Sequence, residues 1–159
     1  VHPGVAERTL TSAQLLALFA GKQKAWADAT PVVPLQREQG DSGHEAMARA
    51  LPGWAEVDAD SWRTNRWRTQ FHDRSQLDAL LTTPGAIGLV DGASVRALGL
   101  PLPLLAIDGH SPTEEGYPAW KPLAFIVRGE PTAEVGKFIG CVRSPVGLGV
   151  IRSVGALPP

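Results

Sequence analysis

The feature that most constrains the fold is a succession of short apolar strands and helices between residues 73 and 108. Leucines at helical spacing open this stretch, and the Pro84–Gly85 pair ends the predicted helix. The apolar run at 86–90 predicts a buried strand, residues 93–98 a short helix, and the run at 103–108 another strand. Strand, helix and strand at this spacing predict an α/β lobe with short connections.

Capping patterns locate further helix ends. Thr11 and Gln14 have the spacing of a capping box, an apolar face follows them, and Gly21 supplies a left-handed stop. Asp73 and Gln76 are predicted to cap the helix that opens the strand–helix–strand series.

Two more strands are predicted outside that series. A short strand lies within 26–36, where Pro31 and Pro34 restrict it to a sheet edge or to strand ends, because proline has no N–H to donate. The apolar run at 122–129 predicts a strong strand. Residues 54–70 are compatible with either a helix or a strand. Their interleaved tryptophans and arginines are interpreted as packing, with arginine stems laid over tryptophan faces.

The C-terminal part reads as two helices. Pro131 is predicted to be the first residue of an amphipathic helix, and Cys141 a small apolar filler near its buried edge. A last helix is predicted from Ser144–Pro145 to about Val154. The apolar stripe of the first helix consists of Val135, Phe138, Ile139 and Val142.

Composition excludes several classes of protein. A chain of 159 residues, 43% hydrophobic and 19% charged, is predicted to fold as one domain over 1–159. Its net charge of -1 gives no attraction to nucleic acid or anionic membranes. One cysteine excludes a disulfide framework and a cysteine-rich metal site. No apolar stretch reaches the roughly 18 residues of a membrane span, and no signal peptide is visible.

Catalytic patterns are lacking. The four histidines show no metal-ligand spacing, and no Gly-x-Ser-x-Gly motif accompanies the His72–Asp73 pair. Gly92 and Gly99 are too far apart for a dinucleotide fingerprint. The sequence therefore predicts no enzyme, no metal site and no cofactor.

A candidate anion site lies where residues 37–51 enter a helix. The start of a helix offers free N–H groups and the positive end of its dipole. Gly40 and Gly43 allow a close approach, Ser42 adds a hydroxyl, and Arg37 is the only full positive charge nearby in sequence. These residues predict an anion seat. The alternative is a well-capped surface helix that binds only its own N–H groups.

Four motif groups occur in order along the chain. Residues 10–38 contain LT, QLLALFAGK and TPVVP before the arginine, and 83–90 read TPGAIGLV. Residues 106–131 contain IDG, PT, YP, KPL and GEP, and 138–158 contain VRSPVG. Together they resemble the phosphate-binding component of bacterial ABC transporters, and more broadly the type II periplasmic solute-binding proteins.

The resemblance implies an α/β periplasmic-binding-protein type II-like lobe, with a mixed sheet flanked by helices. Residues 9–110 are expected to form the second-lobe core, and 117–159 the return strand and C-terminal helices. Most of the first lobe, which lies upstream in the family, is expected to be missing. The resemblance also implies phosphate or a similar oxyanion as ligand, a membrane ABC permease as partner and a periplasmic or other extracytoplasmic location.

Two alignments of the family's anion loop are open. With Arg37 and the following glycine aligned, Asp41, Ser42 and Gly43 occupy its Ser, Gly and Thr positions. A slip of one residue places Ser42 and Gly43 on Ser-Gly and His44 on the Thr position. In either case the Asp41 carboxylate competes with an anion for the same N–H groups. It either accepts a hydrogen bond from a protonated ligand or simply caps the helix.

Two functions therefore stay open. One is a non-catalytic solute-binding domain of the phosphate or oxyanion type. The other is a sensory or protein-interaction domain on the same lobe, with a decayed anion site. Without first-lobe partners, the face of the 122–129 strand that carries Phe125 and Val127 is expected to be exposed and to drive self-association.

Overall fold

A computed structural model describes residues 1–158 and contains two parallel sheets with helices packed around them. The elements in chain order are β1 (Thr9–Leu10), α1 (Ser12–Phe19), β2 (Val33–Arg37), α2 (Ser42–Ala50), α3 (Trp54–Arg63), β3 (Arg68–Gln70), α4 (Asp73–Thr82), β4 (Ala86–Gly88), α5 (Gly92–Ala97), β5 (Ala106–Ile107), α6 (Ala133–Arg143) and α7 (Pro145–Ser153).

The central sheet has the strand order β3-β2-β4, and β1 pairs with β5 in a second sheet. Leu35 pairs with Arg68 of β3 and with Gly88 of β4 in parallel register. The α/β lobe predicted from the sequence is confirmed. The expected mixed sheet is not, because every strand pair within residues 1–158 is parallel.

Of the two places predicted for the prolines, the sheet edge is wrong, because β2 is the middle strand. The strand end holds: Pro31 precedes β2, and Pro34 is its second residue. The N–H of Val33 points toward β4 and donates to the carbonyl of Gly85 at 3.1 Å. Successive N–H positions in a strand alternate in direction, so the nitrogen of Pro34 faces the β3 side. The ladder with β3 begins only at Leu35. The missing N–H therefore breaks no ladder bond.

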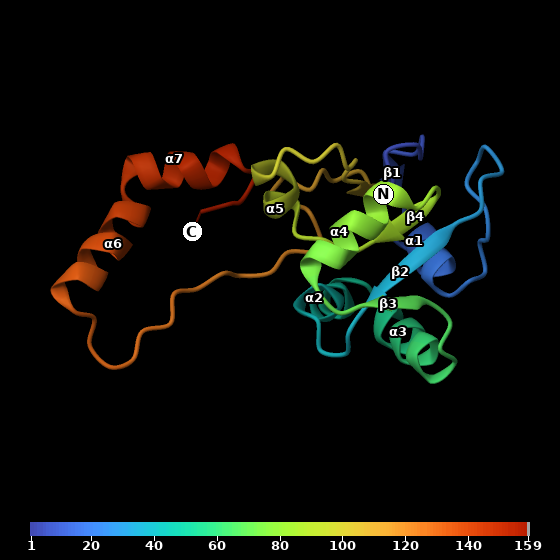
Figure 1. Cartoon of the computed structure of the whole chain (residues 1–159), viewed down its shortest axis with the longest axis horizontal. Coiled ribbons are helices and arrows are strands. Elements are labelled where there is room, and N and C mark those ends of the chain that lie inside the picture. The colour runs from blue at the N-terminus through green and yellow to red at the C-terminus, as the bar shows by residue number, and fades with distance from the viewer. Residues whose placement is uncertain (159) are drawn as a thin grey trace.

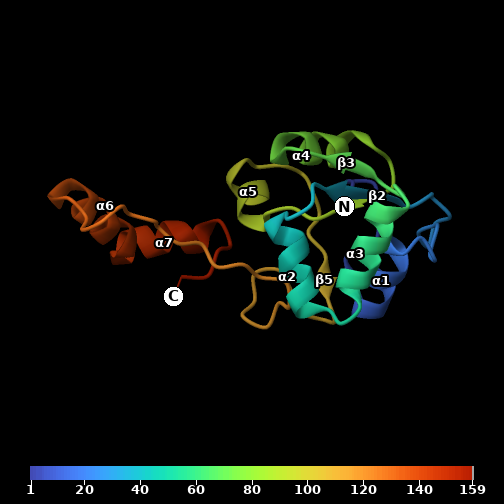
Figure 2. The same ribbon diagram turned by 90° about the horizontal axis from the view of Figure 1, so that it is seen from below.

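Two apolar cores lie on opposite sides of the central sheet. Figure 2 shows α4 on one face and α1, α2 and α3 on the other. On the second face, Leu18 and Trp54 are almost fully buried, and Phe19 packs on Trp54 with ring centroids 4.9 Å apart. On the first, Leu80 is fully buried among residues that include Val95.

Local capping explains where several helices begin. The capping box of Thr11 and Gln14 is confirmed, and Gly21 takes a left-handed conformation. The predicted cap at Asp73 is wrong by one residue. His72 has the extended backbone of an N-cap, and its N–H donates to the hydroxyl of Ser75 at 3.3 Å. Residues 54–70, which the sequence allows to be helix or strand, contain helix α3 followed by strand β3.

Residues 120–158 form an arm beside the body of the protein, as Figures 1 and 2 both show. The strand predicted at 122–129 is wrong, because this segment pairs with no other strand among the described residues. A lone extended segment has no partner for its backbone N–H and C=O groups. The expected exposure is confirmed: Phe125 is 54% exposed and Val127 40%.

The C-terminal helices form without a core of their own. Helix α6 begins after the N-cap Thr132, so Pro131 precedes the cap and is not the first helical residue. Neither α6 nor α7 contains a buried residue in the described structure, and Cys141 is exposed, contrary to its predicted filler role. The last helix starts after Ser144 as predicted. The division into a 9–110 core and a 117–159 return segment stays a prediction.

Candidate functional site

The candidate site lies at the carboxyl ends of β2 and β3, where α2 and α4 begin. Arg37 is the last residue of β2 and pairs in register with Gln70, the last residue of β3. Asp41 is the N-cap of α2, and Asp73 is the first residue of α4. In parallel α/β sheets this edge is where ligands bind, because helix N-termini converge there.

Arg37 is buried and is surrounded by carboxylates. Its side chain is 7% exposed. Its Nη2 lies 3.0 Å from Glu38 Oε1 and 3.1 Å from Asp73 Oδ1, and its Nε lies 3.3 Å from Asp41 Oδ2. Its Nη1 is buried without a hydrogen-bond partner among residues 1–158. The guanidinium thus ties the N-termini of α2 and α4 to the end of β2 and retains unused donor capacity.

Asp41 occupies the N–H groups that an anion would use. Its Oδ1 accepts from the N–H groups of Gly43 at 2.9 Å and His44 at 3.3 Å. A carboxylate at this place is favoured by the helix dipole and caps the helix. Asp41, rather than Ser42, is therefore the N-cap. The carboxylate stands where one face of an oxyanion would sit.

Ser42 forms a hydrogen bond with a residue from a distant part of the chain. Lys121 donates from Nζ to the Ser42 hydroxyl at 3.1 Å, across 79 positions of sequence. Sequence reasoning missed Lys121 as a member of this site. Its KPL motif entered the family resemblance, but no spacing linked it to the start of α2.

The imidazole of His44 turns toward α3. Its Nδ1 lies 2.7 Å from Asp58 Oδ1, and its ring lies 5.7 Å from that of Trp54. The Nε2 atom is buried without a partner within the described chain. The backbone N–H of His44 thus belongs to the candidate anion site, whereas its side chain packs α2 against α3.

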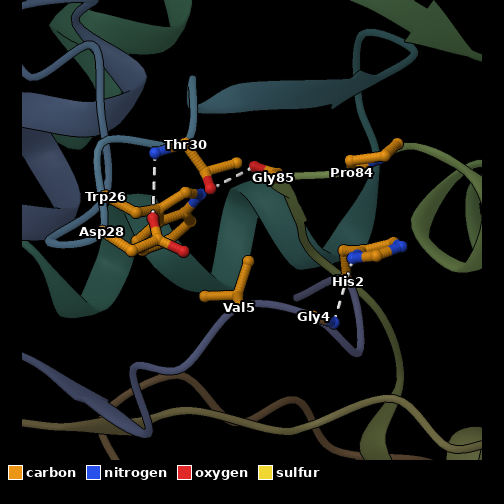
Figure 3. Close-up of a pocket in the computed structure, with 8 residues that line it drawn as sticks. All are labelled: His2, Gly4, Val5, Trp26, Asp28, Thr30, Pro84 and Gly85. Carbon is orange, nitrogen blue, oxygen red and sulfur yellow. Dashed lines mark hydrogen bonds between the residues drawn. The ribbon is translucent and has the colours of Figure 1, made fainter.

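The cavities lie elsewhere or are small. One cavity has a volume of about 110 Å³ and is lined by His2, Trp26, Gly85 and their neighbours. Figure 3 shows these lining residues. Gly85 immediately precedes β4, so this cavity lies at the amino ends of the strands, opposite Arg37. A space of about 30 Å³ adjoins Asp73 and Gln76. We place the candidate site by its donors and charges, because neither cavity collects an anion-binding set.

Residues 1–158 contain neither a metal-ligand cluster nor a membrane-spanning helix. No group of three or more histidine, cysteine or acidic side chains is placed to hold a metal ion. None of the helices combines the length and apolar character needed to cross a membrane.

Comparison with solved structures identifies the fold. No protein-family model matches the chain, and no curated protein matches its sequence. The chain superposes over its full length on a phosphate ABC transporter substrate-binding protein of Clostridium perfringens, solved with bound phosphate, with a TM-score of 0.77 and 17% identity. PstS of Borrelia burgdorferi gives a TM-score of 0.64 and 15% identity over 99% of the chain.

In both comparisons the chain spans 66% of the other protein's length. The superposition includes the body and the arm, since it covers essentially the whole chain. The resemblance seen in the sequence motifs is thus confirmed at the level of three-dimensional structure. The chain has the α/β fold of the substrate-binding proteins of phosphate ABC transporters.

Proposed function

We propose that this chain is the solute-binding lobe of a phosphate-type substrate-binding protein and holds an oxyanion at the N-terminus of α2. The observation that carries the proposal is the placement of Arg37, a buried guanidinium at the start of two helices with an unpartnered Nη1. Buried arginine donors combined with helix N–H groups are a chemistry that suits planar or tetrahedral oxyanions. The Clostridium perfringens neighbour was solved with bound phosphate.

The Asp41 carboxylate sets the chemical requirement on the ligand. An incoming anion must either displace Asp41 from the N–H groups of Gly43 and His44 or donate a hydrogen bond to it. At neutral pH phosphate keeps a P–OH group that can donate, whereas sulfate has none. Phosphate is therefore the ligand that we propose: its oxygens take the N–H groups of Gly43 and His44 from Asp41, and its P–OH group donates a hydrogen bond to the displaced carboxylate.

We further propose that the lobe delivers its ligand to a membrane ABC permease outside the cytoplasm and has no catalytic role. The support is the fold match of the whole chain to 66% of a substrate-binding protein of a phosphate ABC transporter. One lobe supplies only part of the donors that a closed site would provide, so the affinity is expected near 1 mM, about -4 kcal/mol.

A sensory or protein-interaction domain with a decayed anion site is the second candidate. The observation that favours it is the set of carboxylates around Arg37, from Glu38, Asp41 and Asp73. Like charges about 4 Å apart cost on the order of 4 kcal/mol at an effective dielectric constant near 20, so these groups oppose a further anion.

Calorimetric titration with phosphate and with sulfate at neutral pH separates the two candidates. The transport function predicts millimolar binding of phosphate and weaker binding of sulfate. It also predicts stronger binding of both anions to Asp41→Ser, which removes the competing carboxylate but keeps a good cap. Asp91→Ser is the matched control, because Asp91 caps α5 through two N–H groups in the same way. Absence of phosphate binding in both the wild type and Asp41→Ser would contradict the transport function and favour the sensory or protein-interaction domain.

A further inference from the structure

Lys121 lies at the point where the chain leaves the body for the arm. It follows Trp120 and precedes the exposed segment that leads to α6. Its ammonium group donates to Ser42, the first residue of α2. The contact brings a second cation to the helix end that already carries Arg37.

The two cations differ in whether neighbouring carboxylates neutralise their charge. Arg37 is in contact with Glu38, Asp41 and Asp73. Lys121 makes no ion pair in the described part of the chain, and its partner at Ser42 is a neutral hydroxyl. An ammonium group with three donors and one neutral acceptor has two further donors available. At this helix end, Lys121 is the positive charge that no carboxylate has neutralised.

A second, independent observation points to a ligand at the same place. The Arg37 side chain is 7% exposed, its Nε contacts the N-cap of α2, and its Nη1 has no acceptor within residues 1–158. A buried donor without an acceptor destabilises the protein, and an oxyanion next to it would supply the missing acceptor. Arg37 and Lys121, each with donor capacity to spare, therefore contact the N-terminus of one helix from two distant segments.

We propose that Lys121 is the second cationic binding residue of the oxyanion site, which exchanges its hydrogen bond with Ser42 for one with the ligand. This inference rests on the proposed function and adds to it the residue that supplies uncompensated charge. It also gives the site a link to the arm, because the backbone next to Lys121 begins the segment that carries α6 and α7.

The test compares three variants of the chain in phosphate titrations at low and moderate salt. Lys121→Gln keeps a hydrogen-bond donor for Ser42 but removes the charge, and Lys121→Arg keeps both. Lys137→Gln is the control, because Lys137 is an exposed lysine on α6. We expect Lys121→Gln to weaken phosphate binding about tenfold and Lys121→Arg to stay within about threefold, as for one charge-assisted contact. The difference should shrink with added salt.

The outcomes separate this inference from the function on which it rests. Phosphate binding that is equal in the wild type, Lys121→Gln and Lys137→Gln leaves the proposed function standing and overturns the role of Lys121. Equal weakening by Lys121→Gln and Lys137→Gln shows a general effect of net charge and overturns it as well. If the wild type binds no phosphate, both the function and the inference fail.

Discussion

The Asp41 carboxylate contacts Arg37 with one oxygen and the α2 backbone with the other. Oδ2 lies 3.3 Å from Arg37 Nε, and Oδ1 accepts the N–H of Gly43 at 2.9 Å. The residue that caps the helix is therefore also a counter-ion of the arginine. An oxyanion at this place needs the same two partners, so ligand binding and helix capping are in direct competition.

Arg37→Ala should destabilise the protein by about 2–3 kcal/mol, because it removes one partner of a partly buried ion-pair cluster. The Arg37 side chain is only 7% exposed, so the substitution removes a buried charged group. Removing it leaves Glu38, Asp41 and Asp73 without their shared partner, which costs more than losing a surface ion pair.

Urea unfolding of Arg37→Ala checks this value. The control is Arg74→Ala, because Arg74 is 87% exposed and its one ion pair among residues 1–158 is with Asp78, one turn further along α4. It should change the free energy of unfolding by less than about 0.5 kcal/mol. Equal stability of the two variants would show that the carboxylates of Glu38, Asp41 and Asp73 do not depend on the arginine.

The chain should self-associate through the arm. Ile126 is 96% exposed and Leu123 78%, beside the exposed Phe125, whose ring contacts that of Phe138 at 5.6 Å. Apolar side chains gathered on an unpaired extended segment favour contact with another chain.

Light scattering over a range of protein concentrations measures this association. Ile126→Asp should give a monomer at concentrations where the wild type associates, with little change in the free energy of unfolding, because the side chain is exposed. A wild-type chain that stays monomeric at high concentration contradicts the prediction.

Tyr117 should make stability fall at alkaline pH. Burial raises the pKa of its phenol above the ordinary value of 10.0. Above pH 10 the unfolded chain therefore loses this proton while the folded protein still holds it. Stability then decreases as the pH rises from the unfolded pKa toward the folded one.

Tyr117→Phe removes this titration and should flatten the pH dependence of the unfolding free energy above about pH 10. Because Tyr117 is the single tyrosine of the chain, the ultraviolet absorbance of tyrosinate reports its ionisation directly. Parallel alkaline stability curves for the wild type and Tyr117→Phe would show that the phenol titrates equally in the folded and unfolded states.

Patterns that act within a few residues predicted local structure well. The Thr11–Gln14 box, the Gly21 stop and the α7 start depend on adjacent backbone geometry, and each is confirmed. The α/β lobe was predictable because strand and helix periodicities alternate over residues 73–108. At the cap of α4 the sequence offered two polar neighbours, and backbone conformation selected His72 over Asp73.

Properties that depend on distant partners were not predictable. The run at 122–129 has the composition of a strand, but a strand also needs a neighbour with free backbone groups. The stripe on α6 predicts burial only if another surface covers it. At the site, the contact of Lys121 with Ser42 joins residues 79 positions apart, and no local pattern encodes it.

The backbone amide signals of Gly43 and His44 test the central claim most directly. In a two-dimensional NMR titration with phosphate, the account predicts that these two N–H signals shift most, because the ligand exchanges with Asp41 for them. The Ala93 and Ser94 amides, which Asp91 caps in the same way on α5, should stay in place. Shifts confined to other residues, or equal shifts at both helix starts, would contradict an oxyanion site at the N-terminus of α2.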